Sequence, residues 1–331
     1  MRFLISGLGS IGQRHARNLL SLGEEDLVLH RSGKGTLQVD DFSQIPCETD
    51  LDIALEKWSP DAVVISNPTS EHLVVALRAA REGCHILLEK PVSHNLERIE
   101  ALREALEKSN CRALVGYQFR YHPGLEKVKS LLDAGSLGRP ISARVHWGEY
   151  LPEWHPWEDY RQSYSARVDL GGGVILTLSH PFDYLHWLFG DVDSVSAAAG
   201  TCGDLDIEVE DTAEINLFFG SGLMASVHLD YNQRPPRHGL EIIGTEGTIE
   251  WNAASGIAHW WNVASGVWQE QKPADNFKRN SLFLAEMEHF IEVVRGIAVP
   301  ICTLEDGVRA LEIALAAKQS AAQKSGMVSL R

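Results

Sequence analysis

The first third of the chain alternates short, nearly continuous apolar runs with amphipathic stretches. Strands that are covered on both faces form solid apolar runs, and strand–helix–strand units build parallel sheets. The stretches between the runs have the spacing of helices packed on such a sheet. The expected strands cover residues 3–6, 27–30, 62–66, 85–88 and 113–116, and the expected helices cover residues 13–22, 71–82 and 96–108. This pattern predicts a doubly wound parallel sheet.

After about residue 120 the strand candidates alternate between apolar and polar residues and follow one another through glycine-bearing turns. Such alternation is typical of antiparallel strands with one solvated face. The expected strands cover residues 209–219, 222–231, 239–244, 248–251 and 258–262, and the expected helices cover residues 122–134, 173–189, 281–295 and 304–324. We therefore expect an α/β protein in which residues 121–331 form an α+β domain with an open, mostly antiparallel sheet. Its last helix is a candidate to pack back on the domain of residues 1–120.

Composition limits the function more than it defines it. A chain of 331 residues, with 44% hydrophobic and 23% charged residues, suits two globular domains. The net charge of −15 argues against a nucleic-acid partner, because phosphate binding needs a basic surface. The chain enters an apolar strand at once and has no long apolar run, so we expect a cytoplasmic protein with no membrane partner. Its five scattered cysteines predict free thiols and no metal site.

A glycine motif follows the first expected strand and opens the first expected helix. Gly7-x-Gly9-x-x-Gly12 in that setting is the dinucleotide-binding turn of a Rossmann domain. Gly7 permits the tight turn, Gly9 lets the backbone approach a pyrophosphate, and Gly12 allows close packing of helix on strand. The helix start at Ser10 and Ile11 supplies N–H groups for the phosphates. The motif predicts binding of NAD(P).

The end of the second expected strand bears on the choice of cofactor. An acidic residue there would bind the ribose 2′-hydroxyl of NAD, but residues 29–34 contain none. Arg31, Ser32 and Lys34 could instead hold a 2′-phosphate through charge-assisted hydrogen bonds. We expect a preference for NADP(H), with use of NAD(H) left open. The alternative is a basic loop that contacts only solvent.

Three further motifs join the glycine turn. They are Ser66-Asn67-Pro68-Thr69-x-x-His72, Glu89-Lys90-Pro91, and the segment 116–121, which reads Gly-Tyr-Gln-Phe-Arg-Tyr. Together with the glycine run 171–173 before His180, they make the chain resemble the Gfo/Idh/MocA family of oxidoreductases over essentially its whole length. The resemblance implies hydride transfer between a nicotinamide and a C–OH or C=O group of a sugar, sugar acid or nucleotide sugar.

Lys90 is the candidate for the principal acid/base. Hydride transfer needs a proton carrier beside the reacting oxygen, and a lysine at the carboxyl end of a parallel strand faces the ligand crevice. The resemblance implies that the Lys90–Pro91 bond is cis. It also implies a cofactor-binding set made of Gly7, Gly9, Gly12, Asn67, Pro68, Thr69, His72, Glu89 and Lys90.

The substrate side departs from the family pattern. Many members carry an Asp and a His four residues apart on the helix after the glycine run, whereas here Thr177 precedes His180 by three. Threonine can hydrogen-bond a substrate hydroxyl but cannot act as a carboxylate base. Asp183 could orient His180 or cap a neighbouring element, so the catalytic candidates are Lys90, His180, Thr177 and Asp183.

The segment 154–167 is rich in aromatic and hydrogen-bonding residues. It fits a carbohydrate-binding loop, and its arginines suit a carboxylate or phosphate on the substrate; a subunit or domain interface is the alternative. The substrate-binding candidates are Tyr117, Arg120, Trp157, Tyr160, Arg161 and His180.

Two other functions remain open. The missing Asp is compatible with a non-catalytic NAD(P)-binding sensor or regulatory subunit, although an intact Glu89-Lys90-Pro91 element favours an enzyme. A non-sugar substrate is the second alternative. The resemblance also implies a homodimer or homotetramer, assembled through the exposed face of the C-terminal sheet.

Overall fold

The computed structural model describes residues 1–33 and 42–330. The chain divides into two compact units, which we describe separately. Unit 1 contains Met1–Gln118 and Arg279–Val308, and unit 2 contains Phe119–Lys278 and Arg309–Arg331. The predicted division into a domain of residues 1–120 and a domain of residues 121–331, each folding independently, stays a prediction. No helix in the described ranges is both long and apolar enough to cross a membrane.

Unit 1 is built on a six-stranded, fully parallel sheet with the order β3-β2-β1-β4-β5-β6. Its strands are β1 (Phe3–Ser6), β2 (Leu27–His30), β3 (Cys47–Glu48), β4 (Ala62–Ile65), β5 (His85–Glu89) and β6 (Ala113–Gly116). Apart from β3, the strands are almost wholly buried, as their continuous apolar runs predict. The two-residue β3 has no apolar run, which explains why the sequence pattern missed it.

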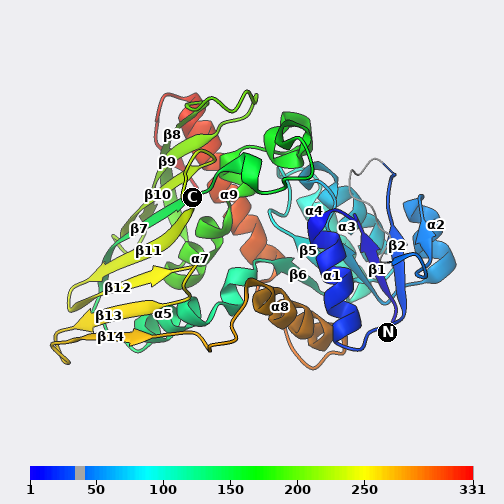
Figure 1. The fold of residues 1–331 in the computed structure, drawn as a ribbon, viewed down its shortest axis with the longest axis horizontal. Coiled ribbons are helices and arrows are strands. Elements are labelled where there is room, and N and C mark those ends of the chain that lie inside the picture. The colour runs from blue at the N-terminus through cyan, green and yellow to red at the C-terminus, as the bar shows by residue number, and fades with distance from the viewer. Residues whose placement is uncertain (34–41, 331) are drawn as a thin grey trace. The chain divides into compact units, whose positions relative to one another are not determined.

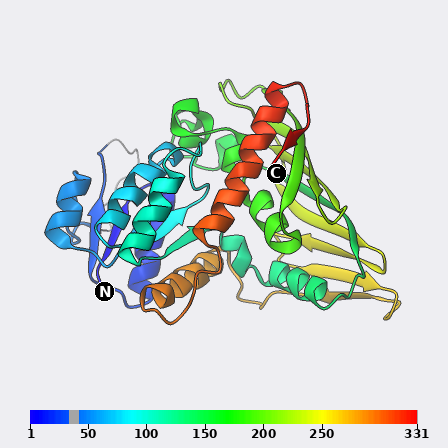
Figure 2. The same cartoon turned by 180° about the vertical axis from the view of Figure 1, so that it is seen from behind.

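Helices cover both faces of this sheet. Figure 1 shows α1 and α8 side by side on one face, and Figure 2 shows α3 and α4 on the other. The helices of unit 1 are α1 (Ser10–Ser21), α2 (Leu51–Trp58), α3 (His72–Arg81), α4 (Ile99–Ser109) and α8 (Arg279–Val294), with a 3₁₀ turn η2 (Thr69–Glu71). The sequence pattern missed α2, an eight-residue helix with only two buried residues. This arrangement confirms the doubly wound architecture.

Unit 2 is built on a nine-stranded sheet with the order β14-β13-β12-β11-β7-β10-β9-β8-β15. All neighbours are antiparallel except β7 and β10, which run parallel. Its strands are β7 (Pro140–Gly148), β8 (Val192–Gly200), β9 (Thr212–Phe219), β10 (Met224–Asp230), β11 (Arg237–Gly244), β12 (Gly247–Asn252), β13 (Ala258–Asn262), β14 (Trp268–Gln271) and β15 (Val328–Ser329). The expected open, mostly antiparallel sheet is confirmed.

The helices of unit 2 include one departure from expectation. They are α5 (Pro123–Asp133), α6 (Val174–Thr177), α7 (His180–Phe189) and α9 (Leu304–Ala322), whose first five residues belong to unit 1. A single helix over residues 173–189 was wrong, because the chain leaves the helix at Leu178 and restarts at His180. Pro181 explains the break: it has no N–H to donate to the carbonyl of Thr177. Thr177 and His180 therefore lie on two different helices rather than on one.

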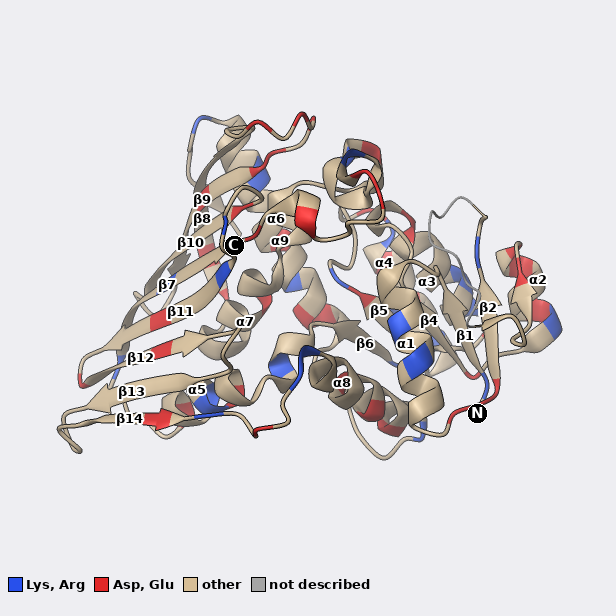
Figure 3. Cartoon of the chain, in the orientation of Figure 1, with Lys and Arg blue, Asp and Glu red and all other residues tan. Residues whose placement is uncertain are grey.

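Charged residues are distributed over both units (Figure 3), consistent with a globular surface around apolar cores. In each unit the buried residues are overwhelmingly aliphatic or aromatic, and burial of this apolar surface is the main driving force for folding. The buried polar residues are the exceptions, and several of them are the candidate site residues.

Candidate active site

The glycine turn between β1 and α1 is tightly packed at two positions and open at the third. A Cβ on Gly7, whose φ is +93°, would lie 2.6 Å from the backbone nitrogen of Asn67. A Cβ on Gly12 would lie 1.9 Å from the carbonyl oxygen of Gly7. A Cβ on Gly9 would meet no described atom within 4 Å, although Gly9 caps α1 with an ordinary φ of −69°. Gly9 therefore borders open space at the helix start.

The loop after β4 holds this turn in place. The Ser66 hydroxyl donates to the carbonyl oxygen of Gly7 at 2.8 Å. The neighbouring Asn67 presents a side-chain oxygen that is buried and accepts no hydrogen bond from any described group. A cradle with open space at Gly9, the helix start at Ser10 and Ile11, and a buried acceptor fits a dinucleotide pyrophosphate and its ribose.

The end of β2 presents Arg31 and Ser32. Arg31 follows the last strand residue directly, and its backbone N–H donates to the carbonyl oxygen of Glu48 at 3.1 Å. Its side chain is half-buried and Ser32 is exposed. Lys34, the third candidate for binding a 2′-phosphate, lies outside the described residues. The strand end thus places one arginine where the cofactor ribose is bound in this fold.

The Glu89-Lys90-Pro91 element lies at the carboxyl end of β5. The Lys90–Pro91 bond is cis, as the resemblance implied. His72 at the start of α3 is buried, and its ring nitrogens lie 2.8 Å from the carbonyl oxygen of Pro91 and 3.0 Å from that of Asn67. His72 therefore links the two loops that border the site. Pro68 and Thr69 lead from Asn67 to His72 through the turn η2.

Two residues that the sequence did not indicate as site residues lie close to the Glu89 carboxylate. His15 on α1 lies with Nε2 2.7 Å from Glu89 Oε1, and the other carboxylate oxygen accepts the backbone N–H of Lys90 at 3.3 Å. Glu286 on α8 brings a second carboxylate to the same buried cluster, within 4.8 Å of the other two groups. His15 follows Gly12 by three residues on one helix, which was the available signal. Glu286 is nearly 200 residues away from Glu89 in sequence, and nothing in its local pattern indicated the contact.

The charge state of this cluster follows from its partners. Burial alone would raise the pKa of the Glu89 carboxyl, but the hydrogen bond from His15 and the charge of Lys90 outweigh it and lower that pKa. Burial lowers the pKa of His72 despite its two carbonyl neighbours. Glu89 is therefore held as a carboxylate beside Lys90, while His72 favours the neutral form.

His180 is the first residue of α7 and is only 2% exposed. Phe119 presents its ring edge-on at a centroid distance of 4.7 Å, and Trp147 lies 5.5 Å away. These aromatic rings fix the orientation of the imidazole. Within unit 2, His180 is thus a rigidly held histidine at a helix start.

Thr177 and Asp183, the other candidates of unit 2, bind protein groups. Thr177 lies beside the phenol of Tyr231, whose hydroxyl donates to the carbonyl oxygen of Ser165 at 3.3 Å and whose pKa burial raises well above the usual 10. Asp183 accepts from the guanidinium of Arg120 through three contacts of 2.7–3.2 Å, with both residues almost fully buried. Arg120 and Asp183 are therefore joined in a buried ion pair within unit 2. Tyr117, another candidate for binding the substrate, is fully buried in unit 1.

The segment 154–167 forms a series of short turns with local pairs. Its 3₁₀ turns are η5 (Tyr160–Gln162) and η6 (Tyr164–Ala166), and η4 (Leu151–Glu153) and η7 (Val168–Leu170) adjoin it on either side. The Tyr160 hydroxyl donates to the carbonyl oxygen of Leu205 at 2.7 Å, and Arg161 pairs with Asp159 at 3.0 Å. Trp157 is 56% exposed. The segment therefore offers an exposed indole beside charge-paired arginines.

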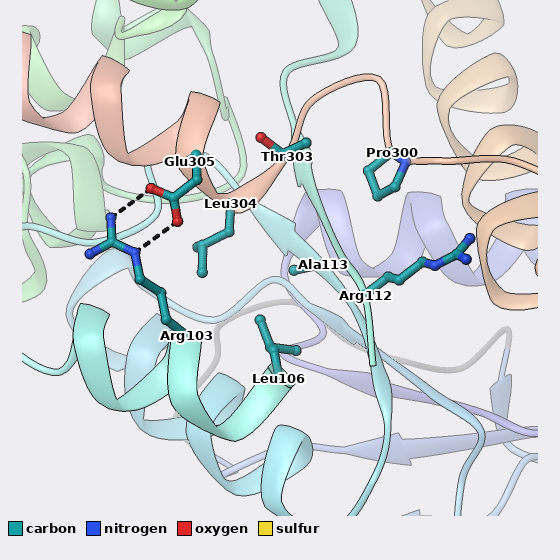
Figure 4. Close-up of a pocket in the computed structure, with 8 residues that line it drawn as sticks. All are labelled: Arg103, Leu106, Arg112, Ala113, Pro300, Thr303, Leu304 and Glu305. Carbon is teal, nitrogen blue, oxygen red and sulfur yellow. Dashed lines mark hydrogen bonds and ion pairs between the residues drawn. The ribbon is translucent and has the colours of Figure 1, made fainter. Parts of the chain in front are cut away.

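A separate pocket of about 360 Å³ lies in unit 1 (Figure 4). It includes Ala113, the first residue of β6, so it borders the amino end of that strand. Arg103 and Glu305 on its wall bind each other through two hydrogen bonds of 2.7 and 2.6 Å. Ligands of doubly wound sheets bind at the carboxyl ends of the strands, so this pocket is not the dinucleotide site.

Strand order, glycine turn and the Glu89-Lys90-Pro91 element define the class: a dinucleotide-binding Rossmann unit joined to an α+β unit. Two family models match the chain, "Oxidoreductase family, NAD-binding Rossmann fold" over residues 1–117 and "GFO/IDH/MocA C-terminal domain" over residues 125–250. The chain belongs to the Gfo/Idh/MocA family of NAD-binding oxidoreductases.

Individual relatives cover nearly the whole chain. A protein of Bacillus subtilis (strain 168) named scyllo-inositol 2-dehydrogenase (NAD(+)) is 28% identical over 97% of this chain and 94% of its own length. The WlbA dehydrogenase of Bordetella pertussis, solved with NADH and UDP-GlcNAcA, has a TM-score of 0.85 at 23% identity and covers 100% of this chain and 98% of its own. Levoglucosan dehydrogenase, solved with NADH, has a TM-score of 0.88 at 20% identity, covering 100% and 99%. The two structures establish likeness of fold.

Proposed function

We propose that this chain transfers hydride between NAD(P) and a C–OH or C=O group of a sugar, sugar acid or nucleotide sugar. The observation on which this proposal rests is the Glu89-Lys90-Pro91 element at the end of β5, held to the glycine-turn side through His72. The names of relatives support the substrate class, since they include an inositol dehydrogenase, a levoglucosan dehydrogenase and a dehydrogenase solved with a UDP-sugar acid.

Lys90 serves as the principal acid/base in this proposal. The bound nicotinamide supplies hydride acceptance or donation, and the protein must move the accompanying proton. Lys90 accepts the hydroxyl proton during oxidation and returns it to the carbonyl oxygen during reduction. The anionic Glu89, held by His15, accepts the backbone N–H of Lys90 and so fixes the backbone at that position.

His180 assists by hydrogen-bonding the reacting oxygen. Its rigid packing against Phe119 and Trp147 suits a group that must hold one direction. Thr177 stabilises Tyr231 beside it, and Asp183 with Arg120 keeps the start of α7 fixed. We assign Thr177 and Asp183 to positioning, and we assign substrate contacts to Tyr117, Trp157, Tyr160 and Arg161.

NADP(H) is the preferred cofactor in this proposal. The family is an NAD-binding one, so the finer preference rests on Arg31 and Ser32 at the end of β2 and on the lack of a carboxylate in residues 29–34. An arginine at this position binds a 2′-phosphate through charge-assisted hydrogen bonds.

A homodimer or homotetramer completes the proposal, assembled through the outer face of the nine-stranded sheet. On that face a mostly apolar row crosses four neighbouring strands, in which Met224 lies between Phe218 and Ser142, and Ser142 pairs with Ile243. We also place the protein in the cytoplasm, where the free thiols of its described cysteines would stay reduced.

A turnover panel tests the function. Purified chain is given NADP or NAD with polyols, free sugars, sugar acids and nucleotide sugars, and nicotinamide absorbance is followed in parallel with Lys90→Ala. Turnover that requires Lys90 supports the enzyme and identifies its substrate class. Tight NADPH binding with no turnover on any compound supports the sensor alternative instead.

A further inference from the structure

A second cluster of chemically active side chains lies in unit 2, on the outer face of the nine-stranded sheet. His146 on β7 and His228 on β10 are directly paired in the parallel register of these central strands (Figure 1). Asp230 follows two residues after His228, on the same face. The alternate residues Val145, Trp147, Val227, and Leu229 are buried on the opposite face. The three polar side chains therefore share one surface.

The geometry of the three groups matches a metal site. One ligand atom from each of His146, His228 and Asp230 lies within 4.8 Å of the others. His228 Nε2 and Asp230 Oδ2 are 3.0 Å apart, and the two imidazole rings stack at a centroid distance of 4.5 Å. Two ligands bound tetrahedrally to Zn²⁺ at about 2.0–2.1 Å are about 3.3 Å apart. We propose that His146, His228 and Asp230 form a binding site for a divalent transition metal of the Zn²⁺ class.

Outer partners orient the ligand groups. His228 Nδ1 lies 2.6 Å from Glu214 Oε1 and Nε2 lies 3.0 Å from Asp230 Oδ2, so a metal bound between His228 and Asp230 would replace the proton at Nε2 while the bond to Glu214 holds the ring. His146 Nε2 donates to the Gln233 amide oxygen at 2.6 Å, which keeps the lone pair on Nδ1. Metal-binding histidines are commonly oriented by such a bond from their other nitrogen.

The Asp230 carboxylate is likewise oriented by a hydrogen bond. Its Oδ1 accepts the backbone N–H of Asn232 at 2.7 Å, so Oδ2 is the oxygen turned toward His228. Gly148 makes room beside it, because a Cβ there would lie 2.1 Å from Asp230 Oδ2 and 2.3 Å from Gln233 Oε1. The cluster thus occupies space that any other residue at position 148 would fill.

The ligand set indicates the kind of metal. Two imidazoles and one carboxylate suit Zn²⁺ and its neighbours better than Mg²⁺ or Ca²⁺, which prefer oxygen ligands throughout. The scattered cysteines predicted no metal site, whereas these ligands are histidines and an aspartate from two strands about 80 residues apart in sequence. The site is independent of the proposed dehydrogenase reaction, because it lies among residues of unit 2 that take no part in it.

Metal titration of the tag-free, chelator-stripped full chain tests the proposal. We expect one equivalent of Zn²⁺ per chain in competition with a chromophoric chelator. His228→Gln and Asp230→Asn should each weaken binding by ~10- to 100-fold. His259→Gln, on β13 of the same sheet, is the matched control and should bind as the parent does. No stoichiometric binding, or equal binding by all four proteins, would overturn the site.

A second measurement uses the unsubstituted chain, so its result does not depend on whether the variants fold. With one equivalent of Cu²⁺ as a paramagnetic probe, electron paramagnetic resonance should show nitrogen couplings from two imidazoles. Coupling to fewer than two imidazoles would contradict the ligand set.

Discussion

At the scale of single residues, two glycines of the glycine turn are required for different reasons: one by the fold and one by the cofactor. A side chain on Gly12 collides with the carbonyl oxygen of Gly7, so this glycine is required by the protein itself. Gly9 has an ordinary backbone conformation and open space where its side chain would be. Only a bound pyrophosphate would exclude a side chain at that position.

The two glycines should therefore respond differently to the same substitution. Gly9→Ala should fold with unchanged thermal stability but bind NADPH at least ~10-fold more weakly, a loss of about 1.4 kcal/mol. Gly12→Ala should lower the free energy of unfolding itself, by about 1–3 kcal/mol, because the turn has no room. Fluorescence titration and thermal denaturation measure the two effects. Normal cofactor affinity in Gly9→Ala would rule out this placement of the pyrophosphate.

Arg31 should discriminate between the two cofactors. Loss of charge-assisted hydrogen bonds to a 2′-phosphate costs about 1.5–3 kcal/mol, so Arg31→Ala should raise KM for NADP by ~10- to 100-fold. The KM for NAD should change little, which makes NAD the internal control. Parallel increases for both cofactors, or no increase, would show that Arg31 does not bind the 2′-phosphate.

At the scale of elements, His122 joins the start of α5 to the sheet of unit 2. Its Nδ1 accepts from the backbone N–H of Gly124 at 3.1 Å and from the indole N–H of Trp251 at 3.2 Å. Its Nε2 donates to the carbonyl oxygen of Ala253 at 3.4 Å. The ring must be neutral to accept at Nδ1, and burial lowers the pKa of His122 to about 4.

This cap predicts a defined acid response. The unfolded histidine, with a pKa near ~6.5, binds a proton before the folded one does, so stability is lost as pH falls from about 6.5 to about 4. The free energy of unfolding should drop by about 3 kcal/mol over that window on account of His122. His122→Asn keeps a capping side chain that does not titrate, and denaturant unfolding should show a shallower pH dependence. Identical slopes for parent and variant would contradict the neutral cap.

Elements also show how far sequence patterns reach. Strands such as Phe3–Ser6 and Ala258–Asn262 were predicted to the residue because their apolar pattern is local. Pro140–Gly148 was missed because its partners β10 and β11 lie about 80 or more residues further along the chain, and Val192–Gly200 was missed because its run of Ser, Ala and Gly has little preference for strands. The glycine turn and Lys90 could be found from motifs. His15 and Glu286 could not be assigned to Glu89, because tertiary packing alone brings them together.

At the scale of the whole molecule, the outer face of the nine-stranded sheet bears on assembly. Met224 is 56% exposed in the apolar row of that face. Light scattering should give the mass of two or four chains, and Met224→Glu should shift it toward a single chain, because a charge would be placed in the interface. Ile53→Glu, at a residue 50% exposed on α2, is the control and should leave the mass unchanged. An unaltered mass in Met224→Glu would exclude this part of the face as the interface.

The central claim is that Lys90 moves the proton that accompanies hydride transfer. Its most direct test is the single-turnover rate of nicotinamide oxidation or reduction, measured with the best substrate of the panel for the parent, Lys90→Met and Lys90→Arg. At saturating NADPH both variants should react at least ~100-fold more slowly, since methionine has no dissociable proton and arginine does not release one. A rate for either variant within threefold of the parent, at saturating cofactor and substrate, would contradict the account.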